Sequence, residues 1–511
     1  MDGTQAVRPN ALPVAALVGG GAIALAAGAV AGGDAAVAGA GAFFVAVLLS
    51  LGQTRTRLLT WPNALLVLIA LLWLVPMKLY RLPVNLPFHL ELYRVLILVL
   101  VLGFVVDSIR SKRQLEAYTA SKPLFVLAAT VLASQIVNSP AIDVPGNEWQ
   151  SAKSLSLFLS FIIVFLLFAS TLDSFREIEH IVAALVVGAV AVAAAAVYEG
   201  YTFYNVFNHL SEWIPGFVRN EREILELRAG RLRVHASAQH PIALGAALMM
   251  VLPFAVYLAS RAKTQLKRGL WIACIPVLLA GAAATISRTT VAMGVGMIVV
   301  TLLVRRQALV RFAPLALVLP ILVHVAAPGA MGGILKSFGE QEGTSFVNSF
   351  YTREGESGSG RLADVVPGFD LWARSPIIGL GIDNPEIATS GTELTGPTPG
   401  RAAAVPLIFD NEYLHTFVTL GLAGLIAMVW LVWGSVVRFV RGAKRIVGPH
   451  GDFVAACAIV CAGYGASMFF YDSLAYIQAT LLLFITAALG LKTIALTNEE
   501  ATASEPASST T

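Results

Sequence analysis

The sequence predicts an all-α protein that crosses a membrane many times, with about 14 transmembrane helices and two long extracytoplasmic loops. Of its 511 residues, 57% are hydrophobic and only 13% are charged, and the mean hydropathy is +0.75. A soluble domain holds about 45–50% apolar and about 25% charged residues. Apolar stretches of about 20 residues recur along the whole chain, each long enough to cross a hydrocarbon core of about 30 Å as a helix. These observations indicate a polytopic membrane protein.

Fourteen apolar segments can be marked as spans. The first resembles a signal peptide in length, but it lacks a strongly basic start and another apolar run follows directly after Asp34, so we expect a retained span. The expected spans lie near residues 12–31, 35–51, 61–78, 90–106, 123–138, 154–172, 181–199, 240–259, 269–286, 289–304, 312–328, 411–433, 453–471 and 474–492.

The connections between these segments alternate in character. Five of them are short and basic, at residues 53–57, 110–122, 261–268, 304–311 and 438–445. The positive-inside rule places such connections in the cytoplasm. Every second connection then falls inside without a conflict, and both termini are expected in the cytoplasm.

Two external connections are too long to be simple turns, and loops of this length are often functional. The middle of the first has Ile224, Leu225 and Leu227 among arginines and glutamates, which predicts an amphipathic helix. The loops divide the chain into N-terminal helices (1–199), an external amphipathic loop (200–239), further helices (240–328), a large external loop (329–410), C-terminal helices (411–492) and a disordered cytoplasmic tail (493–511).

Two external arginines are candidates for function. Arg288 lies in TISRTT, in a turn of a few residues between two spans. Arginine snorkels readily at helix ends, which would make it structural, but the positive-inside bias opposes an arginine on the outer face and favours a binding role. Arg361, in SGSGRLADVVPGFDLW, precedes a helix-like apolar stretch and could point into a pocket. Taken alone, Arg361 is read more simply as a surface charge.

The stretch FDNEYLHTFVTLGLAGL places acids, an amide and a histidine at the start of a span. Asp410 and Asn411 suit an N-cap, where side-chain oxygens accept hydrogen bonds from free backbone N–H groups. His415 lies four residues after Asn411 on the same helical face, and a core or interface histidine is an equally good reading. Gly421 and Gly424 complete an N-x9-G-x-x-G pattern, which favours close packing of a neighbouring helix.

In this order, these pieces resemble the O-antigen ligase and polymerase family of bacterial membrane glycosyltransferases. The ligases carry an H-N-x9-G-x-x-G-like motif after a large periplasmic loop, and this chain reads D-N-x9-G-x-x-G at the matching place. The family also has an S-R pair at an external helix end, and an arginine early in the large loop followed by Trp, Pro and G-x-G. The matching residues are Ser287, Arg288, Arg361, Trp372, Pro376, Gly379 and Gly381.

The resemblance implies a GT-C-type enzyme of the bacterial inner membrane with its active site on the extracytoplasmic face. The implied donor is a glycan joined through diphosphate to a polyprenyl lipid such as undecaprenol, and the acceptor is another glycan, with inversion at the anomeric centre. Besides membrane lipids no further partner is implied, and no nucleic acid, cofactor or metal. Two guanidiniums can bind a diphosphate and stabilise the charge that develops as the sugar leaves, which is the role expected of Arg288 and Arg361.

The segment RLRVHASAQH lies just before a span. In one interpretation, it adds further cations to the diphosphate-binding group of Arg288 and Arg361. Its candidate residues for substrate binding are Arg231, Arg233, His235 and His240. In the other reading, they anchor the chain at the membrane interface.

The chain departs from the ligase pattern at Asp410, which stands where the ligases have a histidine proposed to activate the acceptor hydroxyl. A carboxylate is a weaker base, with a reference pKa of about 3.9. Three alternatives stay open: Asp410 is the base, Glu412 or His415 has taken that role, or Asp410 orients an arginine. In the leading interpretation Asp410 is the catalytic residue that serves the acceptor, and Asn411 and His415 support it. The substitution favours a polymerase, or transfer to an acceptor other than lipopolysaccharide.

Two other classes of protein fit parts of the sequence. A transporter of polysaccharide or lipid-linked glycan would suit the many spans, but transporters usually have ionisable residues or broken helices near the membrane midplane. Here the acids Glu199 and Asp472 lie at span ends rather than mid-span. A non-catalytic scaffold for envelope assembly would suit the replacement of the ligase histidine by Asp410.

Overall fold

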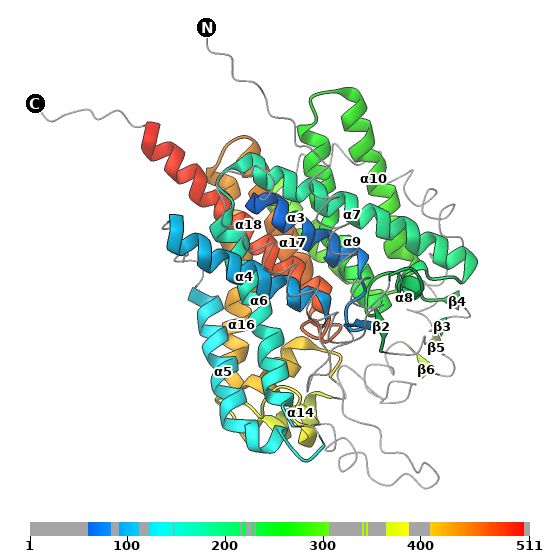
Figure 1. Cartoon of the computed structure of the whole chain (residues 1–511), viewed down its shortest axis with the longest axis vertical. Coiled ribbons are helices and arrows are strands. Elements are labelled where there is room, and N and C mark those ends of the chain that lie inside the picture. The colour runs from blue at the N-terminus through cyan, green and yellow to red at the C-terminus, as the bar shows by residue number, and fades with distance from the viewer. Residues whose placement is uncertain are drawn as a thin grey trace, which may run out of the picture.

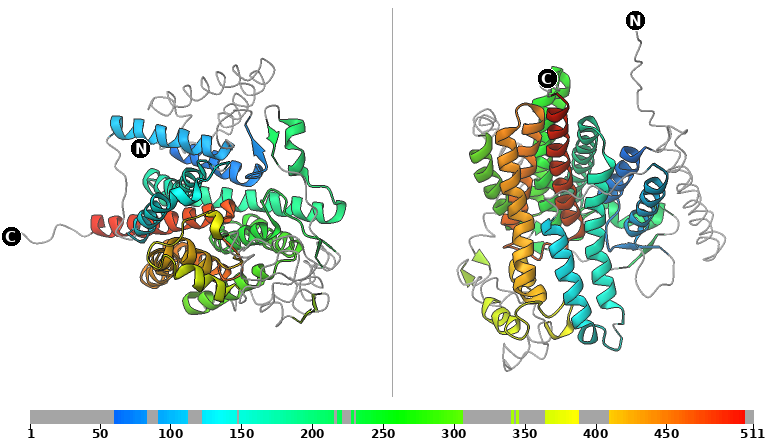
Figure 2. Two further views of the ribbon diagram at one scale, coloured as in Figure 1. Left: turned by 90° about the horizontal axis from the view of Figure 1, so that it is seen from below. Right: turned by 90° about the vertical axis from the view of Figure 1, so that its left-hand side faces the viewer.

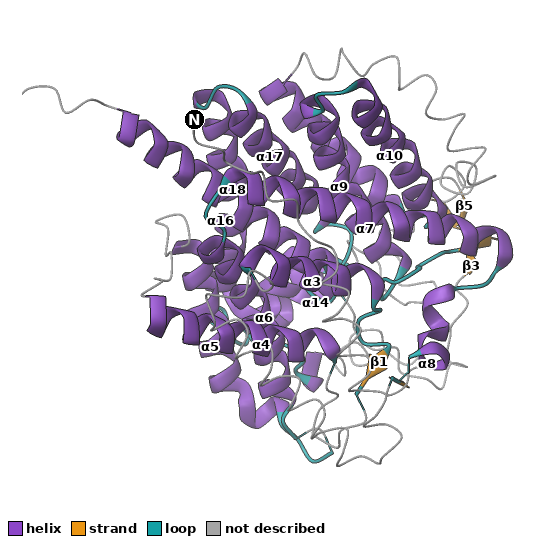
Figure 3. Cartoon of the chain, turned by 45° about the horizontal axis from the view of Figure 1, so that its top comes forward, coloured by secondary structure: helices purple, strands orange, loops and turns teal. Residues whose placement is uncertain are grey.

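A computed structural model shows a bundle of long helices (Figure 1). It describes residues 60–82, 91–111, 122–146, 148–214, 217–220, 227–228, 231–305, 340–341, 344–345, 364–387 and 409–504. Figure 3 shows that helices dominate this part of the chain and that the strands are short.

The helices have the following bounds: α3 (Trp61–Leu74), α4 (Leu92–Ser111), α5 (Lys122–Ile142), α6 (Gln150–Thr171), α7 (Phe175–Thr202), η2 (Val206–His209), α8 (Leu210–Trp213), α9 (Pro241–Arg261), α10 (Gln265–Ala284), the Arg288 helix (Arg288–Arg305), α14 (Val365–Trp372), α16 (Glu412–Arg445), α17 (Pro449–Ser467) and α18 (Ile477–Ser504). Three antiparallel pairs of two-residue strands join β1 (Tyr80–Arg81) to β2 (Val218–Arg219), β3 (Leu227–Arg228) to β4 (Arg231–Leu232), and β5 (Glu340–Gln341) to β6 (Thr344–Ser345).

Nine helices in the described ranges are long and apolar enough to cross a membrane: α4, α5, α6, α7, α9, α10, the Arg288 helix, α16 and α18. This agrees with the prediction of an all-α polytopic membrane protein. Helices α3 and α17 also coincide with expected segments, although α3 has only 14 residues. The expected spans at 12–31, 35–51 and 312–328 lie outside the described residues, so the total of fourteen stays a prediction.

The centre of the bundle is formed by α9 and α18, which are the most buried of these helices, whereas α4, α5 and α10 lie at the periphery. Small residues let the helices approach closely, as is common in membranes. A Cβ at Gly296 of the Arg288 helix would lie 2.8 Å from the Cβ of Ala466 in α17. This contact places the middle of the Arg288 helix beside the C-terminal end of α17.

The connections of the bundle gather at two ends. At one, called here the basic end, Phe453 near the start of α17 contacts Tyr257 near the end of α9. The guanidinium of Arg305 pairs there with Asp452 at 2.9 Å and donates to the carbonyl of Ala443 at 3.1 Å. Basic connections expected on one side of the membrane are therefore neighbours in space.

At the other end, called here the site end, α7, α10 and α17 finish and α9, the Arg288 helix, α16 and α18 begin. The N–H of Glu412 donates to the carbonyl of Met468 at 2.8 Å, which joins the start of α16 to the end of α17. The N–H of Ile477 donates to the side chain of Gln239 at 2.8 Å, which joins the start of α18 to the segment before α9.

Helix α16 is broken at Gly421, whose backbone has φ 67° and ψ −169°. The two arms, 412–420 and 422–445, fold towards each other, because the indole N–H of Trp433 donates to the hydroxyl of Tyr413 at 2.9 Å. In a straight helix these residues, 20 positions apart, would be separated by about 30 Å. Tyr413 also donates to the carbonyl of Gly465 in α17 at 2.7 Å. The shorter arm thus lies back against the longer arm and the end of α17.

The break is filled by residues 376–381, which supply the hydrogen bonds that the helix loses. Carbonyls before the break accept from this segment, and N–H groups after it donate to this segment. The four bonds are Leu380 N to Val418 O (3.0 Å), Gly381 N to Thr419 O (2.9 Å), Leu422 N to Pro376 O (2.9 Å) and Ala423 N to Ile377 O (3.2 Å). Non-helical backbone at membrane depth needs such partners, because no water can satisfy it there.

Helix α5 supports the filled break from outside. Ser134 donates to the carbonyl of Thr419 at 2.9 Å, and the Asn138 amide donates to the carbonyl of Gly379 at 3.1 Å. The right-hand view of Figure 2 shows α5 and α14 beside the lower part of α16. The shorter arm is therefore held by α5, α14, α17 and the 376–381 segment.

Two sequence interpretations are wrong. Gly421 and Gly424 do not serve a neighbouring helix: a Cβ at Gly421 would lie 2.3 Å from the carbonyl oxygen of Ile377, and one at Gly424 would meet Leu420 of its own helix. Leu227 lies in β3 rather than in a helix, because it pairs with Leu232 of β4; Ile224 and Leu225 lie outside the described residues. Helix α18 also runs through residues 493–504, which were expected to belong to the tail.

Candidate functional site

The start of α16 is fixed by a capping side chain. The Asn411 backbone is extended, and its Oδ1 accepts from the N–H groups of Tyr413 at 3.0 Å and Leu414 at 3.4 Å. Of the two expected N-cap residues, Asp410 and Asn411, it is therefore Asn411 that caps the helix. Asp410 is half-buried and lies just before the helix.

Replacing Asn411 with alanine is expected to destabilise the protein by about 1 kcal/mol, because two N–H groups lose their acceptor. Asn411→Asp keeps a side-chain oxygen and should retain most of the stability. Thermal unfolding of both variants in nanodiscs measures the difference. Equal melting temperatures for Asn411→Ala and wild type would show that the cap has no energetic role.

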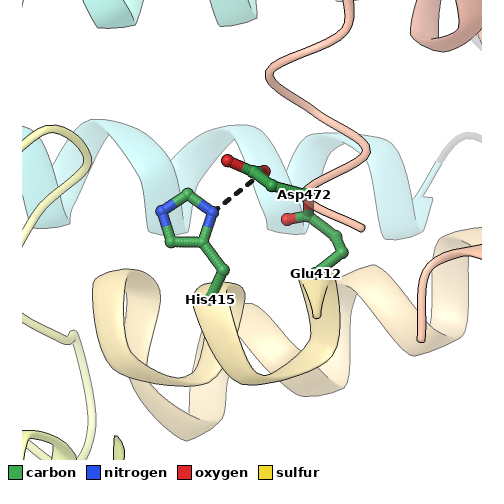
Figure 4. A group of neighbouring side chains, drawn as sticks. All are labelled: Glu412, His415 and Asp472. Carbon is green, nitrogen blue, oxygen red and sulfur yellow. Dashed lines mark hydrogen bonds and ion pairs between the residues drawn. The ribbon is translucent and has the colours of Figure 1, made fainter. Parts of the chain in front are cut away.

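Three side chains meet at the site end: Glu412 and His415 from α16, and Asp472 from the connection between α17 and α18 (Figure 4). The Nδ1 of His415 lies 3.1 Å from Oδ1 of Asp472. One ligand atom from each residue lies within 4.8 Å of the others. We call Glu412, His415 and Asp472 the triad.

Glu412 is fully enclosed and anchors the α17–α18 connection to α16. One carboxylate oxygen accepts from the hydroxyl of Thr416 at 2.8 Å. The other accepts from the N–H of Leu474 at 2.8 Å and the hydroxyl of Ser473 at 3.3 Å. These bonds hold the backbone next to Asp472, so Glu412 positions the acid that pairs with His415.

The pair of His415 and Asp472 has the form of an oriented base. Burial alone would raise the pKa of Asp472, but the neighbouring His415 and the hydrogen bonds it receives lower that pKa to about 2. In the neutral form of His415, a proton on Nδ1 that is donated to Asp472 fixes the tautomer and leaves a lone pair on Nε2. Figure 4 shows this second nitrogen pointing away from Asp472. The pair could therefore take a proton from a hydroxyl placed there.

The triad is also the one group of three metal-ligating side chains brought together in the described part of the chain. Histidine nitrogen and carboxylate oxygens are ligands for several divalent metals. A cation there would have to displace the hydrogen bonds that Glu412 and His415 make to Thr416, Leu474 and Asp472.

Two of the arginines named by the sequence, Arg233 and Arg288, lie at one strained turn at the site end. The buried Arg233 donates through Nε to the carbonyl of Thr285 at 3.4 Å. Ile286 has a left-handed φ of 50°, and the buried Arg288 begins the next helix two residues later. One turn therefore brings together two arginines that lie far apart in the sequence.

A buried acid holds the backbone of the segment that carries Arg233. The carboxylate of Glu199 accepts from the N–H groups of His235 at 3.3 Å and Ala236 at 2.8 Å. Ala236 has a left-handed φ of 45°, and its carbonyl accepts from the side chain of Asn205 at 3.0 Å. Glu199, which the sequence analysis placed at a span end, is thus a support of this segment.

The same segment reaches the connection that carries Asp472. His240 caps α9, its Nδ1 accepting from the N–H of Ile242 at 3.1 Å, and its ring centroid lies 5.5 Å from that of Tyr476. The segment and the triad are therefore neighbours through residues 472–476. Arg361 and the side chain of Arg231 lie outside the described residues.

Two acids of the site were missed as functional residues. Asp472 carried the same signal as Glu412, an acid at the edge of an apolar span, but lies 57 positions from its partner His415. Asp383, whose charge also acts on His415, has a left-handed φ of 59° and accepts from the side chain of Gln150 at 3.1 Å. Nothing local in the sequence marks Asp383.

Comparison with known families identifies part of the chain. Residues 273–429 match the family model described as O-antigen ligase. The match includes Arg288 and the start of α16 with Glu412 and His415, but it does not reach Asp472. No curated protein matches the chain.

Proposed function

Since the chain belongs to the O-antigen ligase and polymerase family and is a multi-pass membrane protein, we propose that it transfers a glycan from a polyprenyl-diphosphate lipid, such as an undecaprenyl one, to a hydroxyl of another glycan. The observation that carries this proposal is the 3.1 Å pairing of His415 with Asp472 at the bundle end where Arg233 and Arg288 adjoin one turn. A base for the acceptor and cations for the leaving group are the two needs of this reaction.

His415 is the general base in this proposal, in place of Asp410. Its Nε2 takes the proton of the acceptor hydroxyl as the oxygen attacks the anomeric carbon. The bond from that carbon to the diphosphate oxygen breaks, and the electron pair leaves with the lipid diphosphate. Attack from the face opposite the leaving group inverts the anomeric centre. Asp472 stabilises the imidazolium that forms.

Guanidinium groups hold the diphosphate. Arg233 and Arg288 are buried at the site end, where a charged side chain without a functional role would be unfavourable. As the sugar leaves, negative charge grows on the diphosphate, and fixed guanidiniums stabilise it more strongly than water would. Arg361, from the large loop, is proposed to complete this group, with Arg231 and His235 at its edge.

The reaction is proposed to take place on the extracytoplasmic face of a bacterial inner membrane in a GT-C-type fold. The support is the charge distribution: Arg305 and the other residues of the basic end lie at the opposite end of the bundle from the triad. The positive-inside rule assigns such an end to the cytoplasm.

The direct test is to incubate the purified protein in nanodiscs with a labelled polyprenyl-diphosphate glycan and an acceptor glycan. Free lipid diphosphate and a longer glycan should appear, with EDTA present, because the residues assigned here supply the acid–base chemistry and the charge. A transporter would move the lipid-linked glycan across vesicles without cleaving it. A scaffold would do neither, and either outcome would refute the proposal.

Arg288→Ala is expected to lower kcat by about 100-fold, the loss typical of one donor to a developing oxyanion. Arg288→Lys keeps the charge but loses the two-pronged contact, so it should recover part of the rate. Initial rates of lipid-diphosphate release measure both, with melting temperatures to show that the variants fold. Full activity of Arg288→Ala would exclude this residue from the diphosphate site.

A further inference from the structure

A second group of cations lies at the site end, on helices outside the family match. Lys78 follows α3, Arg94 begins α4 and Lys153 begins α6, and all three act electrostatically on the carboxyl of Glu91. Lys78 and Lys153 are exposed. Three elements therefore bring three cations to one place.

The group is held by local hydrogen bonds. The N–H of Lys78, whose φ is left-handed at 65°, donates to Glu91 at 2.9 Å. Arg94 donates to the hydroxyl of Ser156 in α6 at 3.0 Å. Glu91 is buried, and its burial raises its pKa, which weakens it as a counter-ion. Three cations therefore surround one buried acid in this group.

An exposed apolar stripe on α4 begins next to this cationic group. Counting from Arg94 in steps of three or four residues along α4, the outward positions are Leu98, Leu102, Val105 and Ile109, and all four are exposed. Residues at this spacing share one helical face. A ligand that fits both parts is an amphiphile with an anionic head and a long apolar tail.

The group is tied to the triad through one residue. The ammonium of Lys78 donates to the carbonyl of Ala475 at 3.3 Å, and the backbone of Ala475 is hydrogen-bonded to the carboxyl of Asp472. The segment that carries Arg233 reaches the same connection through Gln239, which accepts from the N–H of Ile477, and through His240, which lies against Tyr476. In the left-hand view of Figure 2, α3 and α4 lie on one side of α7 and α18, and α9 and α10 lie on the other.

We propose that Lys78, Arg94 and Lys153 bind the diphosphate of a second polyprenyl-diphosphate-linked glycan, the acceptor, and that the enzyme is therefore a polymerase. This rests on the function proposed above. Two cationic groups that approach one base from two sides suit a reaction in which both substrates carry a lipid diphosphate. The attacking hydroxyl is separated from its own diphosphate by the sugars of a repeat, so its headgroup should bind apart from His415.

The test compares two acceptors of the same glycan, one linked to polyprenyl diphosphate and one released from the lipid. In nanodiscs of neutral phospholipid, Lys78→Glu/Lys153→Glu should raise the KM for the lipid-linked acceptor about 10- to 100-fold, because each charge-assisted contact is worth about a factor of ten. Transfer to the released glycan should change by less than twofold. The matched control is Lys263→Glu/Lys267→Glu, two exposed lysines of the basic end, which should leave both acceptors unaffected.

Each other outcome overturns the proposal. Equal slowing with both acceptors would assign the site to the donor or to the fold, and no slowing would assign it no role. A difference between wild type and variant that appears only in nanodiscs containing an anionic phospholipid would make it a phospholipid site. If the wild-type protein used neither acceptor, the proposed function itself would be wrong. That result can be told apart from the others because they all require an active wild-type protein.

Discussion

Replacing His415 with alanine is expected to lower the rate of glycan transfer by about 1,000-fold while the protein stays folded. Proton transfer by a positioned side chain contributes roughly 10²- to 10⁴-fold, and His415 is the residue that the structure pairs with an acid at 3.1 Å. Asp472→Asn should lose about as much, since an amide can donate to Nδ1 and favour the wrong tautomer. The measurement is the single-turnover rate of lipid-diphosphate release in nanodiscs.

The control for this prediction is Asp410→Asn. The family resemblance favours Asp410 as the counterpart of the ligase histidine. Asp410 lies before the helix and outside the triad, so its loss should cost less than about tenfold in rate, below the range for a general base. A loss as large as that of His415→Ala would make Asp410 the base. The assignment of His415 would then be wrong.

Replacing Gly421 with alanine is expected to destabilise the protein by about 3 kcal/mol or more. The backbone of Gly421, with φ 67° and ψ −169°, lies in a region that is essentially reserved for glycine, where another residue costs about 1–3 kcal/mol. The new Cβ would also stand 2.3 Å from the carbonyl oxygen of Ile377, a backbone atom. Relief of that overlap requires the shorter arm, with Glu412 and His415, to move.

Thermal unfolding and transfer rate should therefore fall together in Gly421→Ala. Gly269→Ala in α10 is the matched control, since its Cβ would meet nothing within 4 Å and alanine favours a helix. That variant should be as stable as wild type and as active. A Gly421→Ala protein with an unchanged melting temperature would show that α16 is not broken there in the membrane.

The spans were predictable because each depends on a local property, the length of an apolar run. Helix α9 covers Pro241–Arg261 against an expected 240–259, and α16 begins at Glu412 against an expected 411. The cap at Asn411 was predictable for the same reason. Local composition cannot show where a span stops being straight, so the sequence pattern gave one helix over 411–433 with no break.

The features that shape the site depend on partners far away in the chain. The backbone groups exposed by the break at Gly421 hydrogen-bond to residues 376–381, about 40 positions earlier. The role of Gly379 and Gly381 in the G-x-G pattern is visible only once these two segments are seen in contact. In the same way, Asp472 becomes the partner of His415 only when α17 returns the chain to the site end. Family resemblance located Arg288 and the start of α16, but not the acid that completes the pair.

The proposed reaction requires a lipid diphosphate to bind beside the arginines of the site end, within reach of His415. The most direct measurement is an electron cryomicroscopy structure of the protein in nanodiscs with undecaprenyl diphosphate. Phosphate oxygens are predicted within about 3 Å of guanidinium nitrogens of Arg288 or Arg233, with Nε2 of His415 facing the position of the transferred sugar. A diphosphate bound beside Arg305 at the basic end, or one separated from His415 by the body of the bundle, would contradict it.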